Sequence, residues 1–80
     1  MPRARVKFTF PPDLIKEPVI HNMSMKCNIV TNIRRANVTK DKGWVVLELD
    51  GAQEAIDSAV ASVTALGVRV DPIEGDVIEG

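Results

Sequence analysis

Residues 29–50, IVTNIRRANVTKDKGWVVLELD, decide the fold, because two apolar runs flank a short polar turn. The second run alternates as a half-buried strand does, with Val45, Leu47 and Leu49 directed inward. The first run, residues 29–39, changes parity midway, and a β-bulge near Arg34-Arg35 would restore the alternation. Because the turn at residues 40–43 is short, the two strands are predicted to form a hairpin in which Gly43 supplies a positive φ.

Upstream of this hairpin the chain reads as a strand followed by a helix. Residues 3–10 alternate strictly, and Pro11-Pro12-Asp13 ends the strand because proline lacks a backbone donor. A helix is predicted from Pro18 to Cys27, with Asn28 as a left-handed stop. The helix has an apolar face formed by Val19, Ile20, Met23 and Cys27.

Downstream, a second helix and a final strand complete the pattern. The helix is predicted to begin at Asp50 or Gly51 and to end at Gly67. Gln53 is placed to pair with Asp50 in an arrangement like a capping box. Residues 68–70 form a short strand, and the remaining segment is acidic. The apolar stripe of this helix consists of Ala55, Ile56, Ala59, Val60, Val63 and Leu66.

The order strand, helix, strand, strand, helix, strand predicts an α+β fold, the ferredoxin-like βαββαβ sandwich. Right-handed crossovers place both helices on one face of a four-stranded antiparallel sheet of order 4-1-3-2. The 80 residues form one predicted domain, 1–80, with an ordered core of about residues 3–73 and an acidic tail, 74–80.

Charge is divided between the two halves of the chain. Residues 1–42 carry nine Lys or Arg and three acids, a charge of +6, whereas residues 43–80 carry one Arg and eight acids, a charge of −7. The predicted fold sets the first strand beside the fourth, so the two charges are expected to neutralise each other there. The expected partners are Arg3, Arg5 and Lys7 on one side, and Asp71, Glu74 and Asp76 on the other.

Composition argues against several classes of function. A chain of 80 residues has little interior for a catalytic cavity, and it contains no phosphate-binding glycine loop, nucleophile elbow or cluster of metal ligands. The near-neutral net charge of −1 disfavours a nucleic-acid binder. The lone Cys27 and the absence of a long apolar stretch indicate a cytoplasmic protein without membrane insertion. We therefore predict no catalytic residue, metal or cofactor.

The sheet face opposite the helices carries the most unusual residues. Trp44 and Val46 are expected on this face, which no predicted helix covers and which should be exposed to solvent. An exposed apolar patch often marks a ligand or partner site. The alternative is that Trp44 only covers the adjacent turn. The same face is expected to carry polar neighbours, namely Arg5, Lys7, Thr9, Asn32 and Glu48.

Short segments spread over the whole chain match one known family in their order and spacing, although no single tripeptide is specific. They are residues 8–12 (FTFPP), 16–20 (KEPVI), 32–33 (NI), 36–38 (ANV), 41–44 (DKGW), 47–49 (LEL) and 67–70 (GVRV). On these segments the chain resembles the NIL domain.

The resemblance implies the same ferredoxin-like fold and a regulatory role. NIL domains occur at the C-terminus of ATPase subunits of methionine ABC importers, where paired domains bind the transported amino acid, and beside iron-sulfur ferredoxin modules. The family's Asn-Ile pair matches Asn32-Ile33, and the next motif position, commonly Leu or Ile, is Arg34 here. The ligand-binding residues implied or suggested are Asn32, Ile33, Arg34, Trp44 and Val46.

Two hypotheses of function follow. The first is a non-enzymatic NIL module that forms a homodimer and senses a small amino-acid-like ligand, such as methionine or another sulfur compound. The second is a protein-interaction adaptor that acts in trans on a transporter or on an iron-sulfur oxidoreductase of ferredoxin type.

Overall fold

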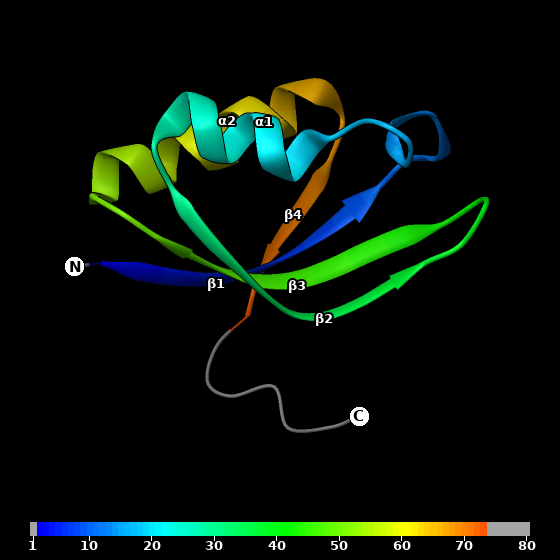
Figure 1. Cartoon of the computed structure of the whole chain (residues 1–80), viewed down its shortest axis with the longest axis horizontal. Coiled ribbons are helices and arrows are strands. Elements are labelled where there is room, and N and C mark those ends of the chain that lie inside the picture. Colours follow the sequence, from blue (N-terminus) through cyan, green and yellow to red (C-terminus); the bar gives the residue numbers. More distant parts are fainter. Residues whose placement is uncertain (1, 74–80) are drawn as a thin grey trace.

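The computed structural model describes residues 2–73, which form a four-stranded sheet covered on one face by two helices (Figure 1). Every adjacent pair of strands is antiparallel, and the sheet order is β2-β3-β1-β4. The predicted α+β fold and strand order are therefore confirmed. The elements are β1 (Arg3–Phe10), a 3-10 turn (Pro12–Leu14), α1 (Val19–Cys27), β2 (Val30–Val38), β3 (Gly43–Asp50), α2 (Gln53–Leu66) and β4 (Arg69–Pro72).

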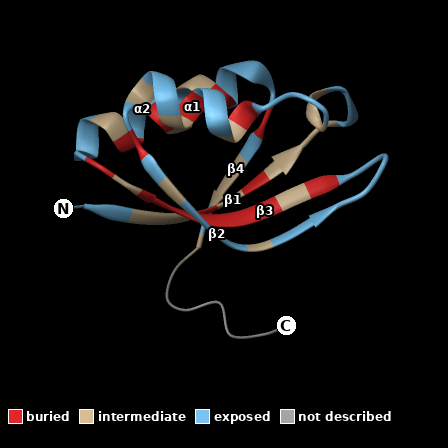
Figure 2. Cartoon of the chain, viewed as in Figure 1, coloured by how far each residue is buried: buried red, intermediate tan, exposed pale blue. Residues whose placement is uncertain are grey.

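The core lies between the sheet and the two helices, where the buried residues of Figure 2 gather. Phe8, Leu47 and Leu49 are fully buried on the helix side of β1 and β3. From the helices, α1 contributes Val19 and Met23, while α2 contributes three residues at helical spacing, Ile56, Ala59 and Val63. Leu66 is 58% exposed, so the predicted apolar stripe of α2 ends one turn earlier than expected.

The predicted bulge in β2 is confirmed. Residue pairing between β2 and β3 shifts between Ile33, which faces Leu47, and Arg35, which faces Val46. The extra residue turns Arg34 out of the regular pairing and lets both halves of β2 present apolar residues to the helix side. β2 is one of the two edge strands of the sheet, and its outer edge pairs with no described strand.

Left-handed residues end both helices as predicted. Asn28 has φ 57° after α1, and Gly67 has φ 110° after α2, so the chain reverses into the next strand. Two other local predictions are wrong. Gln53 does not answer Asp50, because Gln53 Nε2 donates instead to Asp57 Oδ1 and α2 begins after Ala52. Gly43 has no positive φ, because it is the first residue of β3 and pairs with Phe10 on β1.

Within residues 2–73, the two charged halves of the chain form ion pairs between β1 and β3. Arg3 Nε donates to Asp50 Oδ1 at 2.9 Å, and Arg5 pairs with Glu48. Of the expected contacts between β1 and β4, the described residues include Lys7 standing opposite Asp71. The predicted partners Glu74 and Asp76, like the predicted tail 74–80, lie outside the described residues. Charge compensation is thus seen between β1 and β3 as well as at Lys7 and Asp71, and the part of the prediction that concerns Glu74 and Asp76 stays a prediction.

Candidate functional site

The structure brings four of the five predicted ligand residues to one face of the sheet. Trp44 and Val46 lie on the face opposite the helices, Asn32 faces Glu48 in the β2–β3 pairing, and the Arg34 guanidinium reaches toward the Glu48 carboxylate. We call this the open face. Ile33 is the exception, because it faces Leu47 and is directed to the helix side.

The exposed apolar patch that Trp44 and Val46 were expected to form is not seen among the described residues of the open face. Val46 is only 4% exposed and Trp44 is half-buried. Lys7 and Arg35 stand opposite Val46 on the two neighbouring strands, and long aliphatic stems of such residues cover apolar surface while their charges stay outside. Val46 is therefore part of the floor of this face rather than an exposed contact.

Two cations flank the Trp44 ring. Lys7 Nζ lies 5.2 Å from the ring centroid and Arg35 Cζ lies 5.7 Å from it, distances at which a cation is attracted to the π-face of an indole. Sequence reasoning missed Arg35 because it assigned the bulge without deciding which side chain returned to the open face. Trp44 thus lies within cation–π distance of two positive charges on the open face.

Glu48 organises the other half of the open face. Arg5 Nη2 donates to Glu48 Oε2 at 2.5 Å, and Arg34 Nη1 lies 3.9 Å from the same oxygen. The hydrogen bond from Arg5 lowers the pKa of Glu48 below its ordinary value of 4.5, and the nearby positive charges of Arg5 and Arg34 act in the same direction against the cost of burial. The carboxylate consequently stays ionised beside the two guanidinium groups at neutral pH.

This pairing predicts a pH dependence of stability. Because the folded-state pKa is below the unfolded one, the Glu48 contribution is complete above the unfolded value near 4.5 and is lost as the pH falls through the folded value. Glu48→Gln should therefore show a smaller loss of unfolding free energy between pH 7 and pH 3 than the wild type. Urea unfolding at both pH values measures this difference.

The same substitution at Glu54, exposed at the start of α2, serves as the control for removing one carboxylate. Glu54→Gln should lose as much unfolding free energy between pH 7 and pH 3 as the wild type does. If Glu48→Gln also loses as much as the wild type, the Arg5–Glu48 pair does not contribute to the pH dependence of stability.

Within residues 2–73, no group of three His, Cys, Asp or Glu side chains is arranged to hold a metal ion. The helices of this described part are also too short and too polar for any of them to cross a membrane.

Comparison with known proteins gives one family and a shared fold. The family model of the NIL domain matches residues 4–72. No curated protein matches the chain. The C-terminal domain of an ABC transporter ATP-binding protein from Enterococcus faecalis has a TM-score of 0.77 at 19% identity, covering 91% of this chain and 86% of that one. The de novo designed protein Foldit4 has a TM-score of 0.55 at 8% identity, covering 92% and 97%. At these identities the two likenesses concern the fold alone.

Proposed function

The chain belongs to the NIL domain family, and we propose that it is a non-enzymatic regulatory module whose open face binds a small amino-acid-like ligand. The observation that carries this proposal is the grouping of Asn32, Arg34 and Trp44 on one cation-rich face beside the edge of the sheet. Methionine or another sulfur-containing amino acid is the proposed ligand, and the cytoplasm is the proposed location.

The chemistry of the open face suits a zwitterion. The amide of Asn32 both donates and accepts hydrogen bonds, and the half-exposed Arg34 guanidinium can bind a carboxylate. Trp44 lies further along the same face of β3, and Val46 forms the floor between Trp44 and Glu48. A ligand carboxylate would compete with Glu48 for Arg34, whose 3.9 Å contact is much looser than that of Arg5.

We also propose that the module is a homodimer joined through β2. The large hydrophobic side chains exposed on the described residues include three on this one strand, Val30, Ile33 and Val38, exposed by 68%, 54% and 56%. An unpaired edge with apolar side chains is a template for pairing with another strand, and a second copy of β2 offers the same surface. Ile33, although directed away from the open face, then lies at the dimer seam.

The proposed module signals to a separate protein, such as a transporter ATPase or a ferredoxin-type partner. An adaptor without a ligand is the competing function, and the two differ in one measurable respect. A sensor responds to the small molecule alone, whereas an adaptor responds only to its protein partner.

Titration with L-methionine tests the proposal directly. We expect saturable changes in the fluorescence of Trp44, the single tryptophan, and in the backbone amide shifts of β2 and β3 at millimolar ligand or below. Asn32→Ala should weaken binding about tenfold, because a lost hydrogen bond to a charged ligand costs about 1.5 kcal/mol or more.

Asn22→Ala, on the exposed side of α1, is the matched control and should bind as the wild type does. A wild-type protein that shows no change with millimolar methionine or related thioethers is not a sensor of this ligand class. Recovery of a stable transporter or ferredoxin complex by the same protein would then favour the adaptor.

A further inference from the structure

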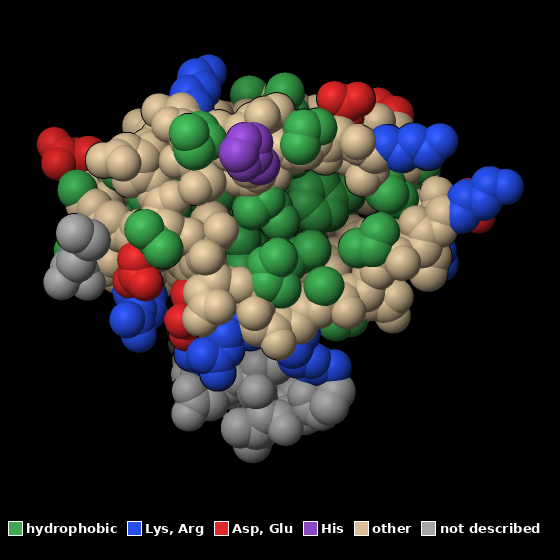
Figure 3. Space-filling view, in the orientation of Figure 1, with side chains coloured by type: hydrophobic (Ala, Val, Ile, Leu, Met, Phe, Trp, Pro, Cys, Tyr) green, Lys and Arg blue, Asp and Glu red, His purple; other side chains and the backbone are tan. Residues whose placement is uncertain are grey.

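A hollow lies on the side of the molecule opposite the open face, between the beginning of α1 and the β2–β3 hairpin. In Figure 3 hydrophobic side chains gather in it below the single histidine. Its volume is about 240 Å³. The residues that line it are mostly apolar and include Phe10, Ile15, Ile20, Val38, Gly43 and Val45.

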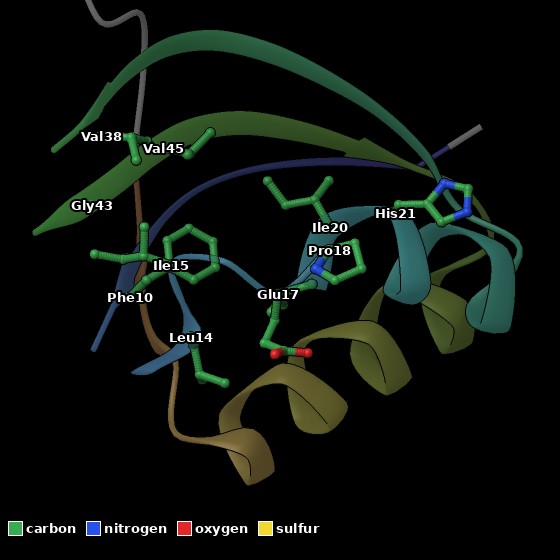
Figure 4. A pocket seen from close by; sticks show the side chains of 11 residues that line it. Phe10, Leu14, Ile15, Glu17, Pro18, Ile20, His21, Val38, Gly43 and Val45 are labelled. Carbon is green, nitrogen blue, oxygen red and sulfur yellow. The ribbon is translucent and has the colours of Figure 1, made fainter. Parts of the chain in front are cut away.

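The walls of the hollow come from segments distant in the sequence. Figure 4 shows Phe10, Ile15, Ile20 and Val45 converging on it from β1, the following loop, α1 and β3, while the Glu17 carboxylate is directed toward α2. The lining is therefore mostly apolar, and its two polar side chains, Glu17 and His21, stand on the α1 side of the hollow. A polar group placed deep among Phe10, Ile20 and Val45 would lose hydrogen bonds to water without replacement, which favours an apolar group at that end of the hollow.

Gly43 keeps the floor open. A Cβ at this position would lie 3.5 Å from Ile15 Cγ1 and 3.7 Å from Val38 Cγ1, which is ordinary van der Waals contact. The backbone of Gly43 is extended β-strand, so an alanine there introduces neither strain nor a clash. The fold would therefore tolerate a methyl group at position 43, and glycine there leaves that space open.

We propose that this hollow is a binding site for a small molecule carrying one compact, uncharged apolar group. The volume of about 240 Å³ is below the range of about 300–1,000 Å³ typical of sites for drug-sized ligands, so a nucleotide or an extended peptide is too large. Cavities with apolar walls bind small apolar molecules in preference to water. The site is separate from that of Asn32 and Trp44, because the sheet lies between them.

A series of linear alcohols from ethanol to 1-hexanol tests the site on the intact protein. Binding is followed by NMR of the protein methyl groups, and shifts should concentrate on Ile15, Ile20, Val38 and Val45. Affinity should rise about fourfold for each added methylene until the hollow is filled, because burying a methylene contributes about 0.8 kcal/mol. Shifts spread evenly over the surface, or affinity independent of chain length, would overturn the proposal.

Two variants narrow the hollow from different sides. Gly43→Ala adds a methyl at the floor and Val38→Phe adds a ring at the mouth, and each should weaken 1-pentanol binding by about fourfold or more. Val30→Phe is the matched control, because Val30 is an exposed valine on the same strand but does not line the hollow. An effect transmitted through the β2 edge would appear in both valine variants and would count against the site.

The outcomes also separate this site from the proposed sensor. Alcohol binding that persists in Asn32→Ala and is weakened in Gly43→Ala supports an independent site. Loss of methionine binding in Asn32→Ala, with no alcohol binding in any variant, leaves the sensor standing and rejects the hollow. If the affinity for alcohols falls as the protein concentration rises, a second copy of the chain competes for the hollow. That result would also reject the hollow as a small-molecule site.

Discussion

Phe8→Ala is expected to lower the free energy of unfolding by about 3–5 kcal/mol, because it removes a fully buried ring and leaves a cavity. Domains of this size have a total stability of about 0.05–0.15 kcal/mol per residue, or roughly 4–12 kcal/mol. The variant should therefore be partly or wholly unfolded at 25 °C. Urea unfolding followed by circular dichroism measures the change.

Phe10→Ala is the control for the aromatic contact. The rings of Phe8 and Phe10 meet edge to face with centroids 6.2 Å apart, so both variants lose that pair interaction. Phe10 is half-buried at the end of β1, and its truncation should cost clearly less. Equal losses in the two variants would mean that the contact between the rings, rather than burial beneath the helices, accounts for the effect.

The order and pairing of the strands could be predicted because they depend on local patterns. Alternation over residues 3–10 marks one buried face, and the parity change in residues 29–39 has only one simple explanation, the bulge at Arg34. The capping box failed for a different reason. Asp50 is held in β3 by its pairing with Arg3 and Val30, so its side chain is not available to begin α2.

The open face was predictable from parity, but its burial was not. Alternation alone assigns Trp44, Val46 and Glu48 to one side of β3, and this is where they lie. Whether Val46 is exposed depends on the neighbouring strands and on where Lys7 and Arg35 place their stems. The alternation of residues along one strand does not indicate whether side chains of the neighbouring strands cover Val46.

The hollow could not be predicted from the sequence. It depends on the path of residues 11–18, where a 3-10 turn follows Pro11 and sets Ile15 against the hairpin. Prolines limit the conformations of this loop without selecting one. The sequence predicts Gly43 in a turn, whereas in the structure Gly43 begins β3 and its absent side chain leaves space beside Ile15 and Val38.

Ile33→Glu is expected to weaken self-association on the order of 100-fold. In a symmetric pairing of two β2 strands, each copy contributes the same residue to the seam, so the substitution introduces two carboxylates into an apolar contact. Leaving a charge buried without a partner costs several kcal/mol, and about 2.7 kcal/mol already corresponds to a hundredfold change. Analytical ultracentrifugation over a range of concentrations measures the dissociation constant.

Leu66→Glu is the matched control for this change, because Leu66 is similarly exposed, at 58% against 54% for Ile33, but lies at the end of α2. The wild type and Leu66→Glu should both sediment as dimers at high micromolar concentration, and Ile33→Glu as a monomer. A wild type that is monomeric there removes the dimer from the proposal. A dimer that survives Ile33→Glu but not Leu66→Glu would place the seam on the helices, and the exposed valines and isoleucine of β2 would then need another explanation.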